Sequence, residues 1–371
     1  MKRSKLQRGR AWNWTPLPIF VFLLIPETVQ AADRITLRSL DSITDKSVKS
    51  FDEDGVRLDD GSLLGWHKID RAKIANNQAD FDLLLKELGE HLFRISERLA
   101  VGDYKDLLPH AEALYPRYKK RRSRTAYMVL QSLMWARLAA GDRERALEPY
   151  LRCYELLRAR HASTKQLPGQ RRLQLDPKTC MARELVPIWF DSDAARTAMP
   201  DVFQAIADMA TPRPPGAYVY YAALALAAGD EKTAARFLLH LSKSEQPAIV
   251  ELKDILTAQR QVVTGNHAAA ISQLSSRLKD LSPAHKPLAL YWLGMSKMMQ
   301  AANGSREAGL LDLLRIPANH GEAHPVLAAA ALFKTMNTLR ESGDALGSVA
   351  VRNELLLRYG QTHFADQAKS Q

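Results

Sequence analysis

The sequence predicts a mainly α-helical protein, a superhelical array of antiparallel helical hairpins preceded by a small antiparallel β meander. Two observations lead to this prediction. Apolar residues alternate with a period of two between residues 35 and 74, as in short strands, and recur at helical spacing from Asn77 onward. Turns centred on glycine then separate helical segments at intervals of 36 to 39 residues, with one longer interval of 88. Periods of this length are typical of stacked helical hairpins.

Residues 1–31 have the layout of a secretory signal peptide. Five basic residues precede an apolar stretch that is strongest at Ile19–Ile25, and small residues end at Ala31. The alternative is an uncleaved membrane anchor. We therefore expect an exported protein of the periplasm or cell-envelope space, with no transmembrane anchoring after cleavage. Of 52 basic and 41 acidic residues, cleavage would remove five basic residues and Glu27, leaving a net charge of +7 that favours anionic surfaces.

Residues 33–75 are expected to form the small β module. Its most distinctive stretch is Asp52–Trp66, DEDGVRLDDGSLLGW, in which two Asp-Gly pairs lie between short alternating runs. Such pairs indicate β-hairpin turns. A helix–loop–helix calcium site would need acids at alternate positions before the glycine and a glutamate at position twelve, and neither Gly55 nor Gly61 has that pattern. The sequence thus predicts hairpins and no metal site.

Residues 77–371 carry a repeated phrase in which an apolar helix ends at glycine and a polar residue caps the next helix. The phrases are LAVGDYKDLL (99–108), LAAGDRERAL (138–147), LAAGDEKTAA (226–235), VVTGNHAAAI (262–271), QAANGSREAGL (300–310) and RESGDALGSV (340–349). The longer interval predicts a degenerate helical hairpin between residues 162 and 214. After the last helix, Gln361–Gln371 is expected to be a polar tail.

These turns, together with LYWLG at 290–294, resemble the tetratricopeptide-repeat family. ELLLRYGQTHFADQAK at 354–369 resembles the closing repeats of exported bacterial proteins of that superfamily. The repeats are longer than the family's usual 34 residues, and aromatic positions are often replaced. The resemblance implies an α-solenoid of about six or seven hairpins with a concave face that holds a peptide or partner segment.

Aligning the turns places eight candidates on this groove: Trp135, Leu138, Val219, Leu226, Tyr291, Met295, Met298 and Met299. Alternatively, these side chains fill the interfaces between hairpins.

Two basic clusters flank one predicted hairpin, and its antiparallel geometry should bring them to one edge. We call them the basic rim, and hypothesise that it contacts an anionic envelope polymer or an acidic partner rather than nucleic acid. Its alternative role is to keep the protein soluble. The rim consists of Arg117, Lys119, Lys120, Arg121, Arg122, Arg124, Arg158, Arg160, Lys165, Arg171 and Arg172.

No established catalytic, phosphate-binding or metal-binding motif occurs in the sequence, so no catalytic residue, metal or cofactor is predicted. The two cysteines, Cys153 and Cys180, either form a disulfide or remain separate buried thiols. We expect a non-enzymatic binding scaffold with an unidentified protein or peptide partner. The alternatives are an envelope-polymer hydrolase, with its site near Asp191 and Asp193 in the long interval, and a structural oligomerisation unit.

Overall fold

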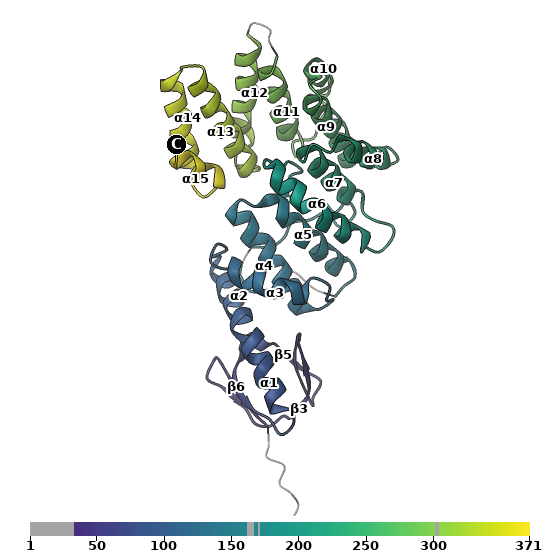
Figure 1. The fold of residues 1–371 in the computed structure, drawn as a ribbon, viewed down its shortest axis with the longest axis vertical. Helices are drawn as coiled ribbons and strands as arrows, with labels where there is room; N and C mark the ends of the chain where they lie inside the picture. The colour runs from purple at the N-terminus through teal and green to yellow at the C-terminus, as the bar shows by residue number, and fades with distance from the viewer. Residues whose placement is uncertain (1–32, 162–166, 170, 301–303) are drawn as a thin grey trace, which may run out of the picture.

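The computed structural model describes residues 33–161, 167–169, 171–300 and 304–371. The expected signal peptide lies outside these residues. The described chain is mainly helical, its consecutive helices pack in pairs, and a small antiparallel β region precedes them (Figure 1), as the sequence predicts. Figure 1 shows the β region at one end of the long axis and α12 and α14 toward the other. No described helix has the length and apolar character needed to cross a membrane.

The β region consists of two three-stranded antiparallel sheets. One has the order β2-β1-β6 and the other the order β3-β4-β5. The strands are β1 (Arg34–Leu37), β2 (Ser42–Ile43), β3 (Val48–Asp52), β4 (Gly55–Leu58), β5 (Leu63–Leu64) and β6 (Ile69–Lys73). The pair Asp52↔Gly55 closes the first hairpin, and Asp60-Gly61 lies in the turn between β4 and β5. Both predicted Asp-Gly turns are therefore confirmed.

The β region shares its core with the first helices. The buried ring of Trp66, at the start of the short helix η1 (Trp66–Lys68), lies 5.0 Å from that of Phe81 in α1 (Gln78–Leu84), measured between ring centroids. Phe51 of β3 stacks edge-on against both rings. A π-helical turn, η2 (Leu85–Gly89), joins α1 to α2 (Glu90–Val101). The forty-residue β region is too small to bury a core alone, and these helices complete it.

The first Asp-Gly turn also attaches the β region to the helices α3 (Leu108–Tyr118) and α4 (Arg124–Ala140). The carboxylate of Asp54 accepts hydrogen bonds from Ser123, the N-cap of α4, and from Arg121. Thr125 Oγ1 donates to the Asp54 carbonyl at 2.9 Å, and the Tyr118 hydroxyl donates to the Glu53 carbonyl. The acids of this turn therefore form part of the contact between the β region and α3 and α4.

Burial of His67 predicts a pH dependence of stability. Burial, followed by the charges of Lys68 and Arg124, lowers the pKa of His67 to about 4 from 6.5. Because the folded state disfavours the charged imidazole, stability present above pH 6.5 is lost as the pH falls toward 4. At about pH 5 the loss should be about 2 kcal/mol. Urea unfolding of the wild type and His67→Gln at pH 7.5 and 5 checks this, and equal losses in both proteins would contradict it.

The remaining helices begin and end largely where the repeated phrases predict. They are α5 (Arg143–Arg158), α6 (Ser192–Ala207), α7 (Pro215–Ala227), α8 (Glu231–Leu241), α9 (Pro247–Val263), α10 (His267–Arg277), α11 (Lys286–Met298), α12 (Ser305–His320), α13 (Pro325–Glu341), α14 (Ala345–Tyr359) and α15 (His363–Lys369). The turn glycines all have positive φ. The side chains of Asp142, Asp230, Asn266 and Asp344 each accept a backbone N–H at the start of the following helix. The predicted turn-and-cap pattern is therefore confirmed for these four helices, whereas α3 and α12 begin without a side-chain cap.

Two sequence-based expectations are wrong. Among the described residues between 162 and 214 there is one helix, α6, and no helical hairpin, because Pro187 and the Asp191 cap exclude a helix immediately before α6. The preceding segment is irregular, with an isolated bridge between Leu175 and Ala182. Gln361–Gln371 is not a tail after the last helix. It contains α15, whose Ala365 and Ala368 are buried.

Candidate functional site

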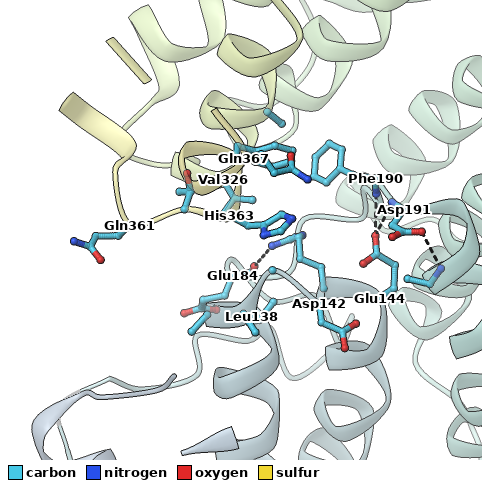
Figure 2. A pocket seen from close by; sticks show the side chains of 18 of the residues that line it. Leu138, Asp142, Glu144, Glu184, Phe190, Asp191, Val326, Gln361, His363 and Gln367 are labelled. Atoms are coloured by element: carbon cyan, nitrogen blue, oxygen red, sulfur yellow. Dashed lines mark hydrogen bonds between the residues drawn. The ribbon is translucent and has the colours of Figure 1, made fainter. Parts of the chain in front are cut away.

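A cleft of about 1140 Å³ lies among the helices of the array. The α4–α5 turn borders it on one side, and α13 and α15 border it on another (Figure 2). The irregular segment before α6 contributes Glu184, Phe190 and Asp191, and α11 contributes Tyr291. Segments from both ends of the array therefore build one site.

Helix α15 closes one side of this cleft by direct contact with the α4–α5 turn. A Cβ atom added at Gly141, where φ is +85°, would lie 2.4 Å from Cγ of His363. Figure 2 shows the His363 side chain directed at this turn. Lys105 Nζ lies 3.6 Å from Asp366 Oδ2, which adds an ion pair between the α2–α3 connection and α15. Glycine at position 141 permits the contact, because any side chain would separate the two segments.

One wall of the cleft is aromatic. The ring centroids of Phe190 and Phe364 are 5.0 Å apart, and those of Phe190 and Tyr291 are 6.0 Å apart. Phe333 of α13 extends the group, at 5.8 Å from Phe364. Across the cleft, the guanidinium of Arg171 lies 3.8 Å from the centroid of the Trp135 ring. Aromatic rings packed edge-on and a guanidinium plane offer broad, rigid contact surfaces to a ligand.

Most of the acidic side chains of the cleft accept hydrogen bonds from backbone N–H groups. The buried Glu144 accepts hydrogen bonds from the N–H groups of Phe190, at 2.9 Å, and Asp191, at 3.2 Å. Asp191 itself caps α6 through Asp193 N and Ala194 N, both at 2.9 Å. Asp142 caps α5. These carboxylates fix the shape of the cleft and are poorly placed to act as general bases.

The predicted groove residues separate into three groups. Leu138 and Tyr291 line the cleft. Trp135, Val219 and Leu226 are buried and fill the core between helices, as the alternative interpretation holds, although the Trp135 ring still carries Arg171. Met295 and Met298 pack partly buried against the core, and Met299 is 64% exposed outside the cleft lining.

The structure places Arg171 of the basic rim away from the start of α4 and pairs Arg117 and Arg121 with acids. Arg117 pairs with Glu87 at 2.5 Å, and Arg121 pairs with Glu53 and Asp54, both at 3.2 Å. Arg171 lies near the end of α4, beside Trp135, whereas Arg124 begins that helix. The hairpin geometry is as predicted, but Arg171 lies beside Trp135 and not at the expected edge.

The other rim residues are also dispersed. Arg158 donates to the Pro212 and Ala210 carbonyls, and Arg172 to the Gly169 carbonyl at 2.6 Å. Lys119 lies over the Tyr115 ring. Lys165 falls outside the described residues. The remaining members are Lys120, Arg122 and Arg160.

Cys153 and Cys180 are free, buried thiols in the structure. Burial raises the pKa of both, which disfavours the reactive thiolate. The long interval therefore has no disulfide, and Asp191 faces an open cleft while capping a helix. A disulfide across this segment and a closed pocket at Asp191 would favour the hydrolase alternative, and the structure shows neither at these residues.

One side-chain cluster contains the groups of a hydrolytic triad without its geometry. Ser282 Oγ donates to Glu251 Oε2 at 2.6 Å, and both oxygens approach the same ring nitrogen, Nδ1 of His285, at 3.2 and 2.7 Å. A triad needs the serine on the opposite nitrogen, Nε2. Ser282 and Glu251 instead join the start of α11 to α9. Within the described ranges, no three His, Cys, Asp or Glu side chains are placed to hold a metal ion.

Sequence reasoning missed most of the cleft residues. Arg143 and Glu144 read as ordinary charges in the first turn of a helix, although both are buried. Phe190 was visible as an aromatic residue before the α6 cap, and Phe364 as an apolar residue at helical spacing from Ala368. Neither signal shows that the two rings meet.

Comparison of this chain with protein-family models, curated proteins and solved structures finds no match to any of them.

Proposed function

We propose that this protein is a non-enzymatic scaffold whose cleft holds a segment of a partner polypeptide. The observation that carries the proposal is the cleft itself, which several helices of the array line with an aromatic wall and polar groups. Its volume of about 1140 Å³ exceeds the range of roughly 300–1,000 Å³ usual for small-molecule sites. A peptide segment with apolar side chains and backbone amides suits such a lining. The resemblance to tetratricopeptide repeats and the expected export to the cell envelope support the same proposal.

The charges of the cleft favour an acidic segment. Its carboxylates at Asp142, Glu144 and Asp191 already accept backbone hydrogen bonds, so they attract a cationic ligand weakly. Arg171 and Lys334 border the cleft, and neither forms an ion pair with a described residue. Complementary charge raises the association rate and selects partners.

Replacing Phe333 with glutamate should abolish partner binding. The substitution places a carboxylate on the aromatic wall, where it removes apolar contact and repels an acidic segment. Leu239→Glu is the matched control, because Leu239 is exposed on α8 outside the cleft lining. Mature wild type and both variants would be used to capture partners from an envelope fraction, with circular dichroism to verify folding. We expect one partner to be retained by the wild type and the control and lost from Phe333→Glu. Equal retention by all three proteins would refute the cleft as the binding site.

A further inference from the structure

A second cavity of about 230 Å³ adjoins the cleft. The two share Arg143, Arg171, Glu184 and Val326 in their linings. Arg183 and His324 also border the smaller cavity. Its volume lies below the range of roughly 300–1,000 Å³ for drug-sized ligands, so it suits a single small group.

The side chain of Arg143 is a buried cation without a counter-ion. Arg143 is 5% exposed. Its guanidinium donates to two backbone carbonyls, those of Glu184 at 3.5 Å and Val186 at 3.2 Å, and its Nε has no hydrogen-bond partner. Among the described residues no carboxylate lies within ion-pair distance, and the adjacent Glu144 is bonded to Phe190 and Asp191. A buried charge is costly unless an opposite charge compensates it.

The same cavity meets the first turn of α13. This helix begins at Pro325 and runs for 17 residues, and His324 provides no side-chain cap. Pro325 has no N–H, and the N–H groups of Val326 and Leu327 have no acceptor inside the helix. All three residues line the cavity. The positive end of the helix dipole therefore adds to the field of Arg143.

The other charged groups around the cavity leave an excess of positive charge. Arg171 and Arg183 stand beside Arg143, against the carboxyl groups of Glu184 and Glu322. Glu184 Oε2 has no hydrogen-bond partner, and burial raises its pKa, so this group is readily neutralised. His324 Nδ1 also has no partner.

We propose that this cavity binds an oxyanion, the carboxylate or phosphate group of a ligand, between the Arg143 guanidinium and the N-terminus of α13. The site goes beyond the proposed peptide-binding function, and free anions should occupy it whether or not the cleft holds a peptide. A bound oxyanion accepts hydrogen bonds from Arg143 Nε and from the free amides of α13, and it supplies the missing counter-charge.

Calorimetric titration with sulfate and with acetate, at constant ionic strength, tests the proposal. Sulfate keeps its charge between pH 5 and 8 and represents the tetrahedral phosphate group, whereas acetate represents a carboxylate. We expect the wild-type protein to bind one anion. Arg143→Gln should weaken binding more than tenfold, and the exposed Arg183→Ala at least threefold. Arg340→Ala, at the opposite end of α13, should bind as the wild type does.

Each outcome decides the proposal. Stronger binding of sulfate assigns a phosphate-like group, and stronger binding of acetate assigns a carboxylate. No binding to the wild type at 50 mM, or equal affinity in all variants, overturns the site. If Arg143→Gln fails to fold, Arg183→Ala and Glu184→Gln test the proposal instead, because both substitutions leave Arg143 and its hydrogen bonds to the backbone carbonyls in place.

The pH dependence of sulfate affinity is a further test, because a purely structural role of these charged residues would not produce it. Deprotonation of Glu184 places a negative charge in the cavity, and burial holds the pKa of Glu184 above its usual value. Burial lowers the pKa of His324 and so opposes a positive charge on this ring. Sulfate affinity should therefore rise as the pH falls through the raised pKa of Glu184, which Arg171 and Arg183 border. Glu184→Gln should bind sulfate more tightly than the wild type at pH 8 and show a smaller pH dependence. Weaker binding by this variant would contradict the proposed arrangement.

Discussion

Replacing Gly309 with alanine should destabilise the protein by about 1–3 kcal/mol. Gly309 of α12 crosses Gly294 of α11, and a Cβ at position 309 would lie 2.6 Å from the Gly294 carbonyl oxygen and 2.9 Å from Met298 N. Both obstacles are backbone atoms of the neighbouring helix, so no side chain can rotate to relieve the overlap. The two helices must separate, and the contacts between them weaken.

The direction of this change in stability distinguishes a glycine at a helix crossing from one in an exposed helix. In an exposed helix, the same substitution stabilises by up to about 1 kcal/mol, because alanine is the better helix former. The free energy of unfolding, measured by urea denaturation, should therefore change in the opposite direction. A stability equal to or above that of the wild type would show that α11 and α12 do not cross at these glycines.

Replacing Glu148 with alanine should cost about 3–5 kcal/mol, the usual effect of removing one partner of a buried ion pair. Glu148 is 3% exposed. It accepts hydrogen bonds from the Tyr115 hydroxyl at 2.5 Å and from Arg152 Nε, and so joins α3 to α5. Without it, the guanidinium of Arg152 and the hydroxyl of Tyr115 stay largely buried and lose their shared acceptor. The free energy of unfolding by urea denaturation measures the effect.

Two further variants separate this pair from ordinary surface charge. A triple variant, Tyr115→Phe, Glu148→Leu and Arg152→Met, removes all three of these buried polar groups and leaves only Asp208, the 40% exposed second partner of Arg152, so it should recover most of the lost stability. The exposed pair of Arg196 and Asp193 is the control, and Asp193→Ala should change stability by less than about 1 kcal/mol. A small effect of Glu148→Ala would mean that water replaces the carboxylate.

The local structure could be predicted because it depends on residues close together in the sequence. Asp-Gly specifies the β3–β4 turn whatever packs around it, and Gly141-Asp142 specifies both the end of α4 and the cap of α5. Gly294 lies in the LYWLG stretch that indicates a repeat helix. However, its close packing depends on Gly309, and no local sequence pattern connects the two glycines. Periodicity identifies an apolar face and does not identify its neighbour.

The candidate site could be predicted only in part, for the same reason. Leu138 and Tyr291 were found because they follow the repeat spacing. The contacts of two basic-rim residues could not be predicted, because a sequence does not show that Arg121 meets the acids of the β region, nor that Arg171 lies beside Trp135. The role of α15 was missed because a seven-residue helix with two charges reads as solvent-exposed, although Phe364 packs into the aromatic wall.

The contact between His363 and Gly141 also determines when the cleft can form during synthesis of the chain. One boundary of the cleft lies in the first complete hairpin, and the other lies among the last nine residues of the chain. A ribosome releases the second only after everything between them has been synthesised. A chain that stops before α15 therefore has helices without a completed cleft, so the cleft forms only once α15 has been made.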